Sequence, residues 1–146
     1  MSLETVFTVT DYWDGPRKGI ANYQGAPHLY ECIFDTTEDD YSDLYRLTPI
    51  DQQTFRLAME NWEIWLRWRA AFDAGKVTVA THPALPEDKN RHEELKNLLQ
   101  AVLQSSPNAI VRKAEFVAQP DSRFQPGLMR PMGVRWTRPD SKTSPI

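Results

Sequence analysis

Residues 61–72 read NWEIWLRWRAAF and carry three tryptophans, Trp62, Trp65 and Trp68, at helical spacing. Indole rings have large apolar surfaces, and burying them stabilises a fold strongly. We therefore expect this segment to form the central helix, with other elements of the fold built around it.

The predicted helix around the tryptophans has clear start and stop signals. Thr48 is a favourable N-cap, Pro49 fits the first helical position, and Asp51 complements the N-terminal end of the helix dipole. Gly75 is typical of the residue that follows a helix. We expect the helix to end at Ala74.

The same helix carries apolar side chains on two opposite sides. The first stripe is the expected core face and comprises Phe55, Met59, Trp62 and Leu66. The second stripe comprises Leu57, Ile64, Trp68 and Ala71. A helix with so little polar circumference is either internal to its domain or shared with a second chain.

Strand patterns precede and follow this helix. Residues 5–10, 19–23, 28–34 and 44–47 read as short strands, separated by turn sequences such as Asp14-Gly15-Pro16. A second helix is predicted over residues 86–103, followed by a strand over residues 109–118.

This order predicts an α+β domain over residues 1–118. We expect a mainly antiparallel sheet of four to five strands, in the order β-β-β-(β)-α-α-β, packed against two helices. A small, partly closed β-barrel with helices is the alternative. Residues 119–146 are basic and contain five prolines together with apolar residues, so we expect a C-terminal arm that docks on a folded surface.

Composition indicates a soluble, cytoplasmic protein. Its 146 residues suit one hydrophobic core, and 40% of them are hydrophobic. Cys32 is the only cysteine, so no internal disulfide can form. The first ten residues have no signal-peptide pattern, and no apolar run is long enough to cross a membrane.

The charges are unevenly distributed along the chain. Residues 1–60 carry 11 acidic and 4 basic residues, and the acids crowd residues 35–43. This loop reads as a solvated loop, as a metal site, or as an acidic face for a basic partner protein, with tyrosines supplying contact area. The candidate partner-binding residues, including the second helix stripe, are Asp39, Asp40, Tyr41, Asp43, Tyr45, Leu57, Ile64 and Trp68.

No catalytic motif, metal-ligand spacing or cofactor fingerprint is present in the sequence. Four arginines after residue 119 alternate with aromatic residues, but the acidic net charge of -3 argues against nucleic-acid binding. We therefore expect a non-catalytic protein-interaction or self-associating module, as a homodimer or larger homo-oligomer. The alternative is a small-ligand-binding protein or enzyme with a pocket between sheet and helix, lined by His28, Tyr30, Glu31 and Arg69.

Overall fold

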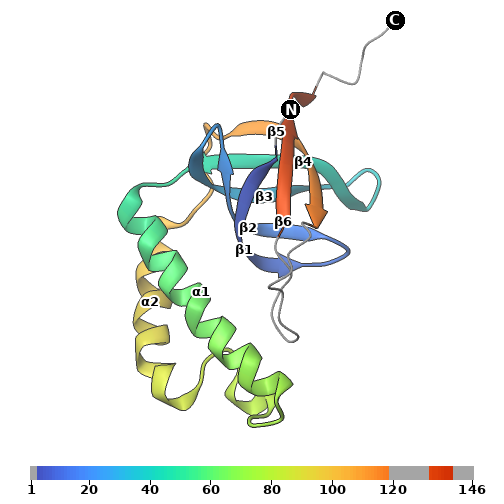
Figure 1. Cartoon of the computed structure of the whole chain (residues 1–146). Helices are drawn as coiled ribbons and strands as arrows, with labels where there is room; N and C mark the ends of the chain where they lie inside the picture. The colour runs from blue at the N-terminus through green and yellow to red at the C-terminus, as the bar shows by residue number, and fades with distance from the viewer. Residues whose placement is uncertain (1–2, 119–131, 140–146) are drawn as a thin grey trace, which may run out of the picture. The chain divides into compact units, whose positions relative to one another are not determined.

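The computed structural model describes residues 3–118 and 132–139, and these residues form two compact units. Residues 51–103 form a helical unit, and the other described residues form a β-barrel unit (Figure 1). The predicted α+β class is therefore confirmed.

Six antiparallel strands form the closed barrel, in which each strand pairs with the next and the last pairs with the first. The strands are β1 (Glu4–Tyr12), β2 (Pro16–Tyr23), β3 (Ala26–Asp35), β4 (Asp40–Pro49), β5 (Ile110–Ala118) and β6 (Met132–Thr137). The alternative prediction of a barrel with helices is thus confirmed, although the expected number of strands, four to five, is too low.

The strand that the sequence did not predict is β6, which lies within the expected C-terminal arm. Val134 and Trp136 of this strand are buried in the barrel core. The alternating pattern is short and lies between Pro131 and Pro139, so proline masked the strand signal. Residues 119–131 and 140–146 lie outside the described residues, and the docking of an arm there stays a prediction.

Aromatic rings fill the interior of the barrel. They come from four strands and are Tyr30, Tyr45, Phe116 and Trp136. Each ring contacts the other three, with centroid separations between 5.4 and 6.3 Å. These mutual contacts make the rings the hydrophobic core of the barrel, since the interior of a small barrel is filled by side chains.

The polar atoms of these rings hydrogen-bond to backbone carbonyls of β1 and β2. The Tyr30 hydroxyl donates to the Thr8 carbonyl at 2.9 Å, and the Tyr45 hydroxyl donates to the Pro16 carbonyl at 2.7 Å. The Trp136 indole Nε1 donates to the Asn22 carbonyl at 2.8 Å. The rings are thereby fixed in orientation, and no polar atom of theirs is buried without a partner.

Gly19 of β2 permits the close approach of β1 and Tyr30. A Cβ atom at this position would overlap the Thr8 carbonyl and lie 2.6 Å from the Tyr30 hydroxyl oxygen. Lack of space for a side chain therefore explains the glycine at this position. Backbone conformation does not, because Gly19 lies in a paired strand with ordinary β geometry.

The helical unit contains α1 (Gln52–Asp73) and α2 (Lys89–Val102), joined through the short 3₁₀ turns η1 (Val79–Thr81) and η2 (Pro86–Asp88). The predicted end of α1 is confirmed, with Ala74 as its C-cap. The predicted N-cap is wrong, because Thr48 belongs to β4 and Asp51 caps the helix instead. The Asp51 carboxylate accepts a hydrogen bond from the Thr54 amide at 2.7 Å, and this bond lowers the pKa of Asp51.

The second apolar stripe of α1 is covered within the helical unit itself. Ile64 clusters with Ala84 and with Leu95 of α2, and Leu57 packs against this cluster. Trp68 donates from Nε1 to the Thr81 hydroxyl at 2.9 Å, and its ring contacts the rings of Phe72 and His82. Ile64 and Trp68 of this stripe are therefore buried, and other residues of the helical unit contact them.

Ion pairs also join α1 to α2. Arg91 of α2 forms a two-pronged pair with Glu60, with both N–O distances at 2.7 Å. Arg67 forms a similar pair with Asp88, at 3.0 Å for each contact. Bidentate pairs of this kind orient two helices more firmly than single contacts do.

Substituting Gly19 by alanine should destabilise the barrel by about 3 kcal/mol, because β1 or Tyr30 would have to move. The midpoint of urea unfolding measures the effect. Gly25→Ala is the control: its φ of 79° costs about 1 kcal/mol, but nothing lies within 4 Å of the added atom. Equal losses of stability in the two variants would contradict the close approach of β1 and Tyr30 to Gly19.

Stability should also fall at high pH. Burial raises the pKa of Tyr30 and of Tyr45 above the ordinary value of 10.0. The unfolded chain then releases these protons at a lower pH than the folded chain does. The contribution of the two hydroxyls to the free energy of unfolding is therefore fully present below about pH 10 and declines as the pH rises further.

Urea midpoints measured from about pH 8 to about pH 11 test this loss. Tyr30→Phe should flatten the decline, whereas Tyr12→Phe should leave it unchanged because the Tyr12 side chain is exposed. A wild-type midpoint that stays constant across this range would contradict the raised pKa values of Tyr30 and Tyr45.

Candidate protein-binding surface

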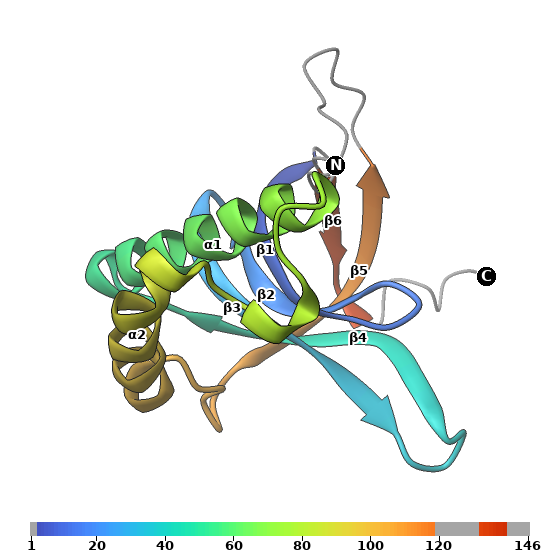
Figure 2. The ribbon, with the colours of Figure 1, turned by 90° about the horizontal axis from the view of Figure 1, so that it is seen from below.

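Two hairpins project from the same side of the barrel, as Figures 1 and 2 both show. One is the β1–β2 hairpin, which turns at residues 13–15, and the other is the β3–β4 hairpin, which turns at residues 36–39. We refer to the ends of these two hairpins together as the hairpin surface. Its rings and carboxylates are Tyr12, Trp13, Phe34, Tyr41, Asp11, Asp14, Asp35, Glu38, Asp39 and Asp40.

Arg17 of β2 ties the two hairpins together. Its Nε donates to the Trp13 carbonyl at 2.7 Å, and its Nη2 donates to the Asp14 carbonyl at 2.9 Å. The same guanidinium lies over the Tyr41 ring of the other hairpin, 4.4 Å from the ring centroid. Its Nη1 is 3.5 Å from the sulfur of Cys32. One side chain thus fixes a turn and holds a ring of the neighbouring hairpin against it.

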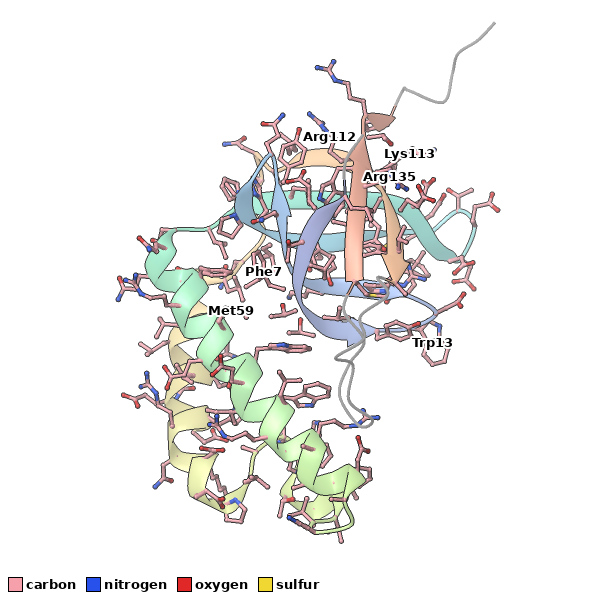
Figure 3. All side chains as sticks on the ribbon, in the orientation of Figure 1. Phe7, Trp13, Met59, Arg112, Lys113 and Arg135 are labelled. Carbon is pink, nitrogen blue, oxygen red and sulfur yellow. The ribbon has the colours of Figure 1, made fainter. Side chains whose placement is uncertain are left out.

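Three of the four rings of the hairpin surface are exposed, whereas Tyr41 packs partly against the barrel core. Trp13 is 71% exposed, Tyr12 is 60% exposed and Phe34 is 44% exposed. Figure 3 shows Trp13 on the β1–β2 hairpin, well apart from Arg112 on another part of the barrel. The edge of Phe34 packs on Tyr41, with ring centroids 5.2 Å apart. Exposed, supported aromatic rings of this kind are typical of protein interfaces.

The turn of the β3–β4 hairpin is acidic and well ordered by its own hydrogen bonds. Asp35 Oδ1 accepts from the Thr37 and Glu38 amides, at 2.9 and 3.3 Å. Asp40 Oδ1 accepts from the Tyr41 amide at 2.7 Å. These bonds use one oxygen of each carboxylate and fix its direction, so the charges have a defined arrangement.

Several of the predicted partner-binding residues lie on or beside this surface. Asp39, Asp40 and Tyr41 belong to the β3–β4 hairpin, and Asp43 lies just beyond them, 3.6 Å from the Lys113 ammonium. Tyr45 does not belong to the surface, because its ring is buried inside the barrel.

The other three predicted partner-binding residues are in the helical unit. Ile64 is 1% exposed and Trp68 is 4% exposed, and Leu57 packs against the cluster around Ile64. Contacts with η1, α2 and their connection cover these side chains, so they do not offer a free surface to another protein.

The four predicted ligand-binding residues fall in both units: His28, Tyr30 and Glu31 lie on β3 of the barrel, and Arg69 lies on α1. His28 and Tyr30 face the barrel interior, where the Tyr30 side chain is completely buried. Glu31 faces outward and pairs with Lys18 at 3.8 Å. Arg69 belongs to the helical unit, where it pairs with Asp73 at 3.0 Å. On β3, Glu31 therefore lies on the opposite face from His28 and Tyr30.

Sequence reasoning missed Arg17, Tyr12, Trp13 and Phe34 as surface residues. A signal was present for two of them, because Tyr12 and Trp13 come directly before the Asp14-Gly15 turn, and large rings beside a tight turn are often exposed. The contact of Arg17 with Tyr41 joins residues far apart in the sequence, so no local pattern could have revealed it.

Within residues 3–118 and 132–139, the structure contains no group of three or more histidine, cysteine or acidic side chains arranged to hold a metal ion. In the same part of the chain, no helix has the length and apolar character needed to cross a membrane. Comparisons of the chain with models of protein families, with curated proteins and with solved structures find no match.

Replacing Arg17 by lysine should loosen the hairpin surface. Lysine keeps the positive charge but cannot donate to both carbonyls while lying flat on the Tyr41 ring. We expect a loss of about 1 kcal/mol in stability and faster hydrogen exchange at the Trp13 amide, which donates to the Gly15 carbonyl.

NMR measurements of hydrogen exchange at the Trp13 amide test the effect of Arg17→Lys. Arg46→Lys, on the exposed outer face of β4, is the matched control. Unchanged exchange at Trp13 in Arg17→Lys would show that Arg17 does not hold the turn.

Proposed function

We propose that this chain is a non-catalytic protein-interaction module that binds its partner through the hairpin surface. The exposure of Trp13 is the observation that carries the proposal. A tryptophan loses little conformational entropy on binding and buries a large area, so it commonly dominates the energy of an interface.

The packing of the barrel supports an interaction on its outside. Because four rings pack together in the interior, a ligand there would have to compete with their packing. The hairpin surface, in contrast, is held by Arg17 before any partner arrives, and a preordered surface loses less entropy on binding. The alternative of a small-ligand protein or enzyme has less support, because Glu31 lies on the opposite face of β3 from His28 and Tyr30.

A second copy of the chain is one possible occupant of this surface. The sequence predicts a homodimer, and a self-complementary contact through Trp13 and Phe34 would account for their exposure. We also propose a cytoplasmic location, which the free thiol of Cys32 supports.

Trp13→Ala should abolish partner binding and leave the barrel folded, because an exposed ring contributes little to stability. The test compares proteins captured from an extract of the source cells by the wild-type chain and by the variant. Val79→Ala is the control, since Val79 of the helical unit is equally exposed, at 71%.

Sedimentation velocity of the same three proteins decides whether the partner is a second copy. If Trp13→Ala retains every captured protein and every oligomer that the wild type forms, the proposed surface is wrong.

A further inference from the structure

We propose that Asp14 is the site of a spontaneous covalent modification, in which its side chain becomes part of the main chain as isoaspartate. The reactants are the Asp14 carboxyl group, the amide nitrogen of Gly15 and water. The modification itself goes beyond the proposed function. Only its consequence for partner binding rests on that function, because Asp14 follows Trp13 in the turn of the β1–β2 hairpin.

The reaction passes through a cyclic imide and is balanced by water alone. The nitrogen of Gly15 attacks Cγ of Asp14, an N–C bond forms, and the amide proton leaves with the carboxyl hydroxyl as water. A second water molecule then opens the ring. Attack of this water at Cγ restores aspartate, whereas attack at the backbone carbonyl carbon leaves the chain linked through Cγ. The second product is isoaspartate, which has the mass of the original residue.

The sequence favours this reaction at one place. Asp14-Gly15 is the only Asp-Gly pair in the chain. Glycine has no side chain to obstruct the approach of its nitrogen to the preceding carboxyl group, and its backbone adopts conformations that other residues rarely reach. Asp11 of the same hairpin is also exposed, but it precedes the large side chain of Tyr12.

The turn leaves both reacting groups accessible. Asp14 is exposed, and among the described residues its carboxylate forms no hydrogen bond or ion pair. The Trp13 amide donates to the Gly15 carbonyl at 3.0 Å, whereas the Gly15 amide donates to no residue that the structure describes. Asp14 also has a φ of 56°, a left-handed conformation that raises the free energy of an L-residue before the ring closes.

Arg17 favours the opening of the ring toward isoaspartate. Its Nη2 donates to the backbone carbonyl oxygen of Asp14 at 2.9 Å. When water attacks this carbonyl carbon, negative charge develops on the oxygen that Arg17 already contacts. A cationic donor at such a distance stabilises an oxyanion, because its charge is in place before the reaction begins.

Isoaspartate would change the turn that presents Trp13. The linkage through Cγ adds one carbon atom to the main chain between Trp13 and Gly15, so the hydrogen bond that joins these two residues loses its spacing. The Asp14 carbonyl that Arg17 contacts becomes a free carboxylate. The exposed Trp13 ring is therefore expected to move, and the hairpin surface changes with it.

The experiment incubates the folded, full-length chain in H₂¹⁸O at neutral pH and body temperature. Each opening of the imide incorporates one heavy oxygen, and mass spectrometry with electron-transfer fragmentation distinguishes isoaspartate from aspartate. We expect labelled isoaspartate to accumulate at residue 14, while Asp11 stays unlabelled as the internal control. A second NMR signal of the Trp13 indole should grow in proportion to the isoaspartate.

Two variants separate the parts of the mechanism. Asp14→Glu keeps the negative charge but would have to close a six-membered ring, so the labelled product and the second indole signal should both disappear. Arg17→Lys should lower the ratio of labelled isoaspartate to labelled aspartate at residue 14, because lysine cannot maintain the same set of carbonyl contacts.

The outcomes decide each part of the proposal. Equal labelling of Asp11, or labelling of residue 14 only after unfolding in guanidinium chloride, would show that the folded turn does not direct the reaction. An unchanged ratio in Arg17→Lys would overturn the role of Arg17, and an unchanged indole signal would overturn the movement of Trp13. None of these measurements involves a partner, so the proposed function can fail while the modification stands.

Discussion

The mutual packing of Tyr30, Tyr45, Phe116 and Trp136 is the constraint on which the barrel depends. These rings come from β3, β4, β5 and β6, and their hydrogen bonds reach the backbone of β1 and β2. Every strand is therefore joined to the same core, and Gly19 is required where β1 and β2 approach it. The rings with the largest exposure lie outside this core, on the β1–β2 and β3–β4 hairpins.

Much of the fold was predictable from local patterns. Alternating residues and turn chemistry placed the first five strands and both helices in the right order, and Gly75 marked the end of α1. Closure of the barrel was not predictable, because it depends on which strands pair at a distance. The strand β6 was hidden by neighbouring prolines, and Asp51 displaced Thr48 as N-cap because β4 continues further than its sequence suggests.

The candidate surface was predictable only in part. Charge clustering identified the acidic β3–β4 turn. Strand alternation could not show that Tyr45 is buried in the core while Tyr41 is only partly buried against it. The apolar stripe containing Ile64 suggested an interface, but Ala84, and Leu95 of α2, pack against Ile64. Trp13 was missed because its exposure is decided by the geometry of a turn that Arg17 holds from another strand.

Nuclear Overhauser contacts between ring protons test the closed, ring-packed barrel most directly. We predict contacts that link Trp136 to both Tyr30 and Phe116, together with backbone contacts between Glu4 and Val134 across the closing pair of strands. A spectrum in which these rings lack mutual contacts, or in which β1 and β6 are not neighbours, would contradict the claim.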